Sequence, residues 1–97
     1  MVLDTILTAL SSPFSILILY LLDRYGEMKL TEILAKIGFS KYKSIRNTIL
    51  LLSKAGLISV GVKLISPRVR AWKIKLTKLG KNIVKAILST IEQHENS

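Results

Sequence analysis

A chain of 97 residues, 49% of them hydrophobic, is long enough for one small domain and too short for two. Its 15 Lys and Arg against 6 Asp and Glu give a net charge of +9, which favours a polyanionic partner, either nucleic acid or an acidic membrane surface. The absence of cysteine excludes disulfides and thiolate metal sites. We therefore expect residues 1–97 to form a single domain.

The N-terminal third is expected to be helical. A short helix over DTILTAL, with Asp4 as a possible cap, precedes Ser12 and Pro13, which predict the start of a second helix: a hydroxyl cap, then a ring suited to the first turn. The second helix, FSILILYLLDRY, ends at Gly26 and is apolar on nearly every side, which predicts burial all round. Because SSP divides the segment, neither piece reaches the ~18–20 apolar residues of a membrane span, and we expect a cytoplasmic protein.

Residues 31–56 are expected to form two short helices joined by a tight turn. A short strand-like MKL comes first, and Thr31 is then the expected N-cap of a helix with Glu32 at its positive end. After a turn over GFS, Ser40 is a possible cap of the second helix, 41–55, which Gly56 closes. Two helices joined in this way are the helix-turn-helix unit.

After Gly56 the period of the hydrophobic pattern changes from 3.6 residues to 2. LISVGVKLI and AWKIKL alternate, with Trp72 and Ile74 on one face and lysines on the other, and SPRVR joins them. This pattern predicts a β-hairpin over 57–76. Thr77 is then the expected cap of a last helix, 77–93.

The order of these elements is that of a winged helix-turn-helix domain, and local strings agree with it. LSSPFSILILYLL resembles the first helix of ArsR-type regulators, SIRNTILLLSKAGLIS resembles the recognition helix and exit of ArsR and MarR relatives, and KIKLTKLGK is similar to the close of their wing. The resemblance covers residues 11–90. It implies a mainly α (α+β) fold with a two-stranded wing, terminal dimerisation helices and a role in transcription regulation. The Asp that often accompanies the wing Arg in MarR-like proteins is missing, with Ser66 and Pro67 in its place, and the thiolates of metal-sensing ArsR members are absent.

One side of helix 41–55 is expected to meet DNA. Ile45, Ile49 and Leu52 share the side that faces the core, together with Leu57 after the exit. The opposite side is polar near the helix N-terminus, where such motifs reach base edges, and Arg can chelate guanine while Asn can chelate adenine. The expected contacts are Lys41, Tyr42, Lys43, Ser44, Arg46 and Asn47. The alternative is a solvated helix face, and for Tyr42 packing on the turn is an equal alternative.

The hairpin is expected to be a basic wing. Arg68 and Arg70 lie at its tip without a nearby acid, and arginine is attracted to narrow A·T-rich minor grooves. We expect both to contact the adjacent minor groove or its phosphates, with Lys63, Lys73 and Lys75 on the stem as phosphate contacts. The alternative is a solvated loop, and we favour packing within the hairpin over base stacking for Trp72.

The two terminal helices carry more apolar residues than one small core needs, which predicts a two-fold dimer. The expected dimer interface is Leu3, Ile6, Leu7, Leu10, Val84, Leu88 and Ile91. The alternative is a crowded monomer core.

Catalysis is not expected, because the sequence offers no paired carboxylates at a plausible spacing, one histidine and no Gly-rich phosphate loop. No cofactor, metal or small-molecule ligand is predicted. The leading hypothesis is a homodimeric transcription regulator of double-stranded DNA. A largely non-specific architectural DNA-binding protein is the first alternative, and a winged-helix protein-interaction module of a larger assembly is the second.

Overall fold

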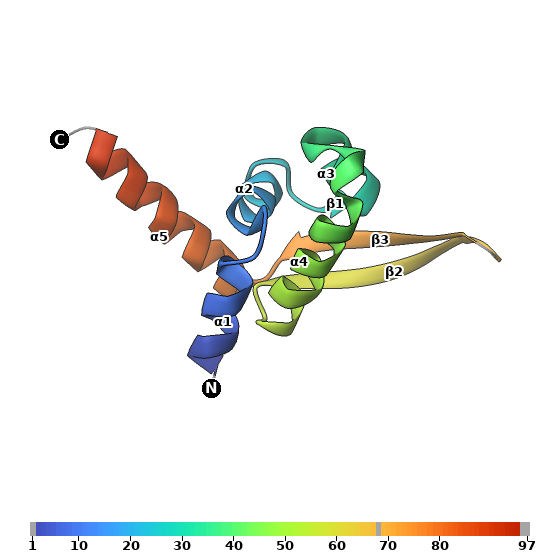
Figure 1. Cartoon of the computed structure of the whole chain (residues 1–97), viewed down its shortest axis with the longest axis horizontal. Helices are drawn as coiled ribbons and strands as arrows, with labels where there is room; N and C mark the ends of the chain where they lie inside the picture. The colour runs from blue at the N-terminus through green and yellow to red at the C-terminus, as the bar shows by residue number, and fades with distance from the viewer. Residues whose placement is uncertain (1, 68, 96–97) are drawn as a thin grey trace.

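The computed structural model describes residues 2–67 and 69–95, which form a mixed α+β fold (Figure 1). The elements in chain order are α1 (Val2–Leu10), α2 (Ser15–Tyr25), β1 (Met28–Lys29), α3 (Leu30–Ile37), the 3-10 helix η1 (Phe39–Lys41), α4 (Tyr42–Lys54), β2 (Ile58–Ser66), β3 (Val69–Leu76) and α5 (Lys78–Glu95). The molecule measures 53 × 30 × 24 Å, with the β2–β3 hairpin projecting at one end and α5 at the other (Figure 1). The predicted class, mainly α with a small β component, is confirmed.

The core forms where the helices meet the root of the sheet. In α4, Ile45, Ile49 and Leu52 are fully buried, as their spacing predicts, and Leu57 is buried beside them. Side chains from the other elements pack around them, among them Ile18, Leu19, Ile33 and Ile74. The core therefore fixes α4 against the sheet and leaves the opposite side of α4 in solvent.

The start of α2 differs from the prediction. The helix begins at Ser15, after Phe14 in a left-handed conformation with φ of 62°. The Ser12 hydroxyl donates to the Thr8 carbonyl oxygen at 3.0 Å, and Pro13 lies in the turn. Ser12 thus hydrogen-bonds back to the last turn of α1 instead of capping α2, and the predicted Ser-Pro start is wrong.

The predicted burial of α2 on all sides is also wrong. Ile18 and Leu22 are buried, but Ile16 is 50% and Leu17 42% exposed, because α4, α5 and β3 cover one side of this helix only.

No described helix is by itself long and apolar enough to cross a membrane. Only Leu3–Leu10 and Ser15–Tyr25 together reach that length and composition, and they meet at 90°.

The N-cap residues of α3 and α4 differ from the predicted ones. Thr31 is not the cap of α3: the N-cap is Lys29, whose backbone N–H donates to a carboxylate oxygen of Glu32 at 3.0 Å. That carboxylate supplies the reciprocal half of a capping box. Ser40 lies inside η1, and α4 follows Lys41 without a side-chain cap.

The sheet is antiparallel, with strand order β1-β3-β2. Met28 pairs with Ile74, and β2 pairs with β3 from Ile58↔Leu76 to Ser66↔Val69. The strands extend further toward the tip than the sequence pattern predicted, and a register shift between Leu64 and Ser66 forms a bulge there. The hairpin therefore stands out as a long two-stranded ribbon (Figure 1).

Candidate nucleic-acid interface

A cavity of about 430 Å³ lies where α3, α4 and the hairpin converge. Its lining is Lys29, Leu30, Thr31, Leu34, Tyr42, Arg46, Ile65, Arg70, Ala71 and Trp72. Three of these side chains are cationic, and none of the described lining residues is acidic. The cavity is therefore positively charged at its rim and apolar on much of its wall.

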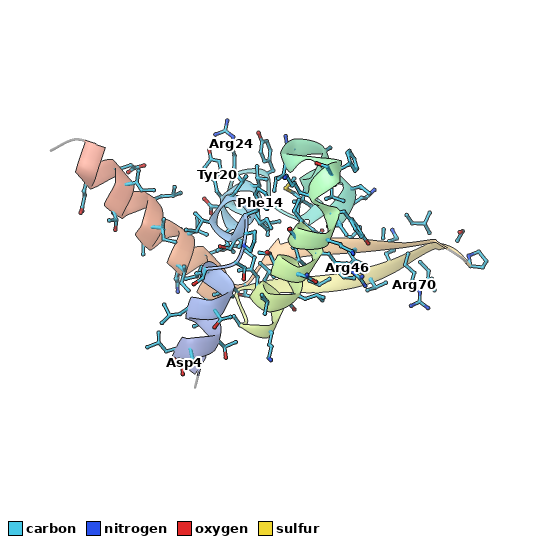
Figure 2. All side chains as sticks on the ribbon, viewed as in Figure 1. Asp4, Phe14, Tyr20, Arg24, Arg46 and Arg70 are labelled. Atoms are coloured by element: carbon cyan, nitrogen blue, oxygen red, sulfur yellow. The ribbon has the colours of Figure 1, made fainter. Side chains whose placement is uncertain are left out.

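Arg46 and Trp72 join α4 to the hairpin across the cavity. The guanidinium carbon of Arg46 lies 5.4 Å from the centroid of the Trp72 ring, within the range of a cation–π contact. Figure 2 shows Arg46 extending from α4 over the root of the hairpin, with Arg70 farther along the ribbon. Because Trp72 is only partly buried, its ring is packed within the fold on one side and is available to Arg46 on the other.

The other residues predicted on α4 lie on its solvent side. Lys43 and Asn47, one turn apart, are exposed, and Ser44 is partly buried beside them. Lys41 is exposed in η1, and Tyr42, 45% exposed, lines the cavity. Lys43 and Asn47 form an outward face that is distinct from the cavity.

The hairpin register divides the predicted cations between two faces. Lys63 pairs with Ala71, and Lys73 pairs with Gly61, so both lysines lie on one face of the ribbon together with Lys75. Side chains alternate along β3, so Arg70 lies on the other face of the ribbon. It shares that face with Trp72, on the cavity side. The structure thus brings Arg70 together with Arg46 and places the three lysines on the opposite face. Arg68 lies outside the described residues.

A second cluster of cations surrounds Tyr25 at the end of α2. The Lys36 ammonium lies 4.3 Å from the Tyr25 ring centroid and the Arg24 guanidinium carbon 5.6 Å from it. The hydrogen bond from Arg24, and then the charge of Lys36, lower the pKa of the Tyr25 hydroxyl, and the same hydrogen bond raises the pKa of Arg24. Arg24 lies well away from Arg70 (Figure 2), so this cluster is separate from the cavity.

The predicted dimer residues fall into two groups. Leu3, Leu7 and Ile91 are exposed, at 60%, 53% and 47%. Ile6, Leu10 and Leu88 are partly buried against the core, and Val84, 3% exposed, belongs to the core itself. Val84 therefore has no surface to offer a partner, because α5 uses it to pack on the body of the molecule.

Sequence reasoning missed Lys29, Thr31 and the pairing of Arg46 with Trp72. Lys29 and Thr31 flank the start of α3, and only the folded arrangement places them beside α4 and the hairpin. The Arg46–Trp72 contact joins a helix to a strand, which no local pattern encodes. Among the described residues, no group of three or more His, Asp or Glu side chains is placed to hold a metal ion.

Comparison of the chain with protein-family models, with curated proteins and with solved structures finds no match.

Proposed function

We propose that this protein is a winged helix-turn-helix protein that binds double-stranded DNA as a homodimer and regulates transcription. In this proposal α3 and α4 are the helix-turn-helix, α4 enters the major groove, and the β2–β3 hairpin is the wing. The resemblance of the sequence to ArsR- and MarR-type regulators supports the regulatory role. The proposal includes no catalysis, metal or cofactor, and it implies a location in the cytoplasm, where the protein would meet its DNA.

The observation that carries the proposal is the convergence of Lys29, Arg46 and Arg70 around one cavity whose described lining contains no acidic residue. Bringing cations together without an acidic side chain between them costs electrostatic free energy unless a polyanion neutralises them, and DNA offers a continuous row of phosphates. The cavity lies between the helix proposed for the major groove and the hairpin proposed for the minor groove. The phosphate backbone that separates two grooves would pass through this position.

We propose different roles for neighbouring residues of α4. Trp72 holds Arg46 toward the hairpin, which suits a phosphate contact better than the guanine contact expected from its sequence position. Asn47 lies on the outward face with Lys43, and we assign base recognition to Asn47 and a phosphate contact to Lys43.

The test compares two double variants that remove the same charge from the chain. Arg46→Ala/Arg70→Ala removes cations from the cavity side, and Lys63→Ala/Lys75→Ala removes them from the opposite face of the hairpin. Binding of a fluorescent duplex is measured by anisotropy at several salt concentrations. We expect the arginine pair to reduce the salt slope by up to about two per subunit, since each phosphate contact contributes about 0.9. The lysine pair should change the slope much less.

Equal effects of the two pairs would show that binding follows net charge and not the cavity face. A protein that binds no duplex at physiological salt would contradict the proposed function altogether. A specific regulator should also bind a selected duplex at least ~10³-fold more tightly than random DNA, whereas an architectural protein should bind both alike.

A further inference from the structure

We propose that the outer half of the β2–β3 hairpin inserts apolar side chains between base steps and bends the DNA that it contacts. This inference rests on the proposed function and adds to it a mechanical role for Leu64 and Ile65. The proposed phosphate and base contacts assign no role to these two apolar side chains, although Ile65 borders the same cavity as Arg70.

The outer half of the hairpin exposes large apolar side chains that its root does not. Ile58, at the root of β2, is 2% exposed, whereas Val62 is 56%, Leu64 63% and Ile65 63% exposed. Pro67 is exposed at the turn that follows. Large apolar side chains in a strand are normally buried against a core. A ribbon that exposes three of them in its outer half therefore indicates a surface that binds a partner.

The charges around these side chains select the partner. Lys63 and Arg70 flank them on the two strands, and Arg46 and Lys29 lie at the root, on the cavity. A partner must therefore combine negative charge with apolar surface that becomes accessible. DNA does so when a base step is opened, because the phosphates remain outside while the stacked faces of the bases accept Leu, Ile or Pro side chains.

The bulge near the tip brings the apolar groups together. Leu64 pairs with Arg70, and the register shift before Ser66 leaves Ile65 as the extra residue of β2. Ile65 consequently lines the cavity with Arg70 and Trp72, although strict alternation would place it on the opposite face. Leu64 and Ile65 are thereby concentrated at one place on the ribbon, beside the cation that Arg70 supplies.

A two-stranded ribbon with its side chains is wider than the ~6 Å minor groove of B-DNA, so its entry must widen the groove. Insertion of side chains between steps widens the groove and kinks the duplex by about 20–90° toward the major groove of the opened step. Flexible pyrimidine–purine steps such as TpA lower the cost of this kink.

The experiment measures binding and bending on the same duplex. A duplex of about 30 base pairs with one central TpA step carries a donor and an acceptor dye at its ends and 2-aminopurine in place of the adenine of that step. The full chain should shorten the end-to-end distance and increase the 2-aminopurine fluorescence, because the modified base loses its stacking partner. Anisotropy gives the affinity in parallel.

Leu64→Ser/Ile65→Ser should abolish both the bend and the fluorescence increase, while binding through the cations persists. Leu64→Met/Ile65→Val is the matched control: it retains apolar bulk at both positions and should retain the bend. Circular dichroism verifies that both variants are folded.

Two results would overturn the inference and leave the proposed function intact: binding of the duplex by the wild type without a bend, or an equal bend in the serine variant. Failure of the wild type to bind the duplex would refute both proposals together.

Vesicles of phosphatidylglycerol and phosphatidylcholine test an acidic membrane as the partner. If the serine variant loses vesicle binding and bends DNA normally, the apolar patch serves a membrane and the inference is wrong.

Discussion

Gly80 stands where the first turn of α5 approaches the chain between α4 and β2. A Cβ at this position would overlap the carbonyl oxygen of Leu57 and lie 3.1 Å from a methyl carbon of Leu76. The Thr77 hydroxyl closes the same junction, because it accepts from the Gly80 N–H at 3.1 Å and donates to the Gly56 carbonyl oxygen at 2.6 Å. The glycine in LTKLG is thus explained by a close approach of two backbones.

Gly80→Ala should therefore destabilise the protein, although alanine is the better helix former by about 1 kcal/mol. The clash is with backbone, which cannot move away as a side-chain end can, and we expect a net cost of about 1–3 kcal/mol. Urea unfolding followed by circular dichroism measures it. Gly61→Ala is the control, because its Cβ would meet nothing closer than the Lys73 carbonyl oxygen at 3.9 Å. A stabilised Gly80→Ala protein would show that the junction is looser than described.

At the scale of single elements, α4 has three sides: one packs in the core, one borders the cavity, and the outward face carries Lys43 and Asn47. Thr48 belongs to the core side: it is fully buried, and its hydroxyl donates to the Pro13 carbonyl oxygen at 2.7 Å. That hydrogen bond ties α4 to the turn between α1 and α2. The helix that would enter the major groove is therefore held on its buried side by both apolar packing and a polar contact.

If α4 reads bases through Asn47, then Asn47→Ala should weaken binding to a preferred site by about 1–3 kcal/mol and leave binding to random DNA nearly unchanged. Lys43→Ala, one turn earlier on the same exposed face, should weaken binding to every duplex alike. Titrations of both variants against the selected duplex and a random one separate these outcomes. Should Asn47→Ala weaken both duplexes equally, base recognition lies elsewhere.

The sequence was sufficient for the elements whose pattern is local and repeated. The spacing of Ile45, Ile49 and Leu52 predicted the buried side of α4, and the alternation around Ile74 predicted β3. It failed at Ser12, because a hydroxyl can bond backward to a helix that is ending as well as forward to one that is beginning.

The alternation in the sequence placed Lys73 and Lys75 on the face of β3 opposite Trp72, but it could not add Lys63 to that face. It also could not show which face meets the helices, because this depends on the register of β2 against β3 and on where α4 packs. The proposed function therefore uses Arg70 on the cavity side of the hairpin, and the phosphate contacts of Lys63, Lys73 and Lys75 stay predictions. The sequence contains every residue that lines the cavity, but no local pattern predicts that residues of α3, α4 and the hairpin come together there.

At the scale of the whole molecule, the proposed DNA-binding surface and the apolar surface of the terminal helices lie apart. The hairpin and the cavity with its cations lie toward one end, and α1 and α5 lie toward the other (Figure 1). Leu3 and Leu7, one turn apart on α1, and Ile91 on α5 are all about half exposed or more. Ala86, Ile87, Thr90 and Ile91 also line a shallow hollow on α5. Two copies joined through this end would leave both hairpins free.

This arrangement predicts a dimer that recognises two-fold symmetric DNA. Light scattering at micromolar concentration should give twice the chain mass of 10.8 kDa, and Leu3→Ser/Ile91→Ser should return it to one chain without unfolding, because both side chains are exposed in the single chain. Val84→Ser, in contrast, should destabilise the fold itself, because Val84 is 3% exposed.

DNA selected by the wild type should contain two half-sites about one helical turn apart, ~34–36 Å, since each α4 would enter the major groove on the same side of the duplex. A mass of 10.8 kDa at every concentration, with selected sites that lack two-fold symmetry, would contradict the dimer and leave the cavity and hairpin as the interface of a monomer.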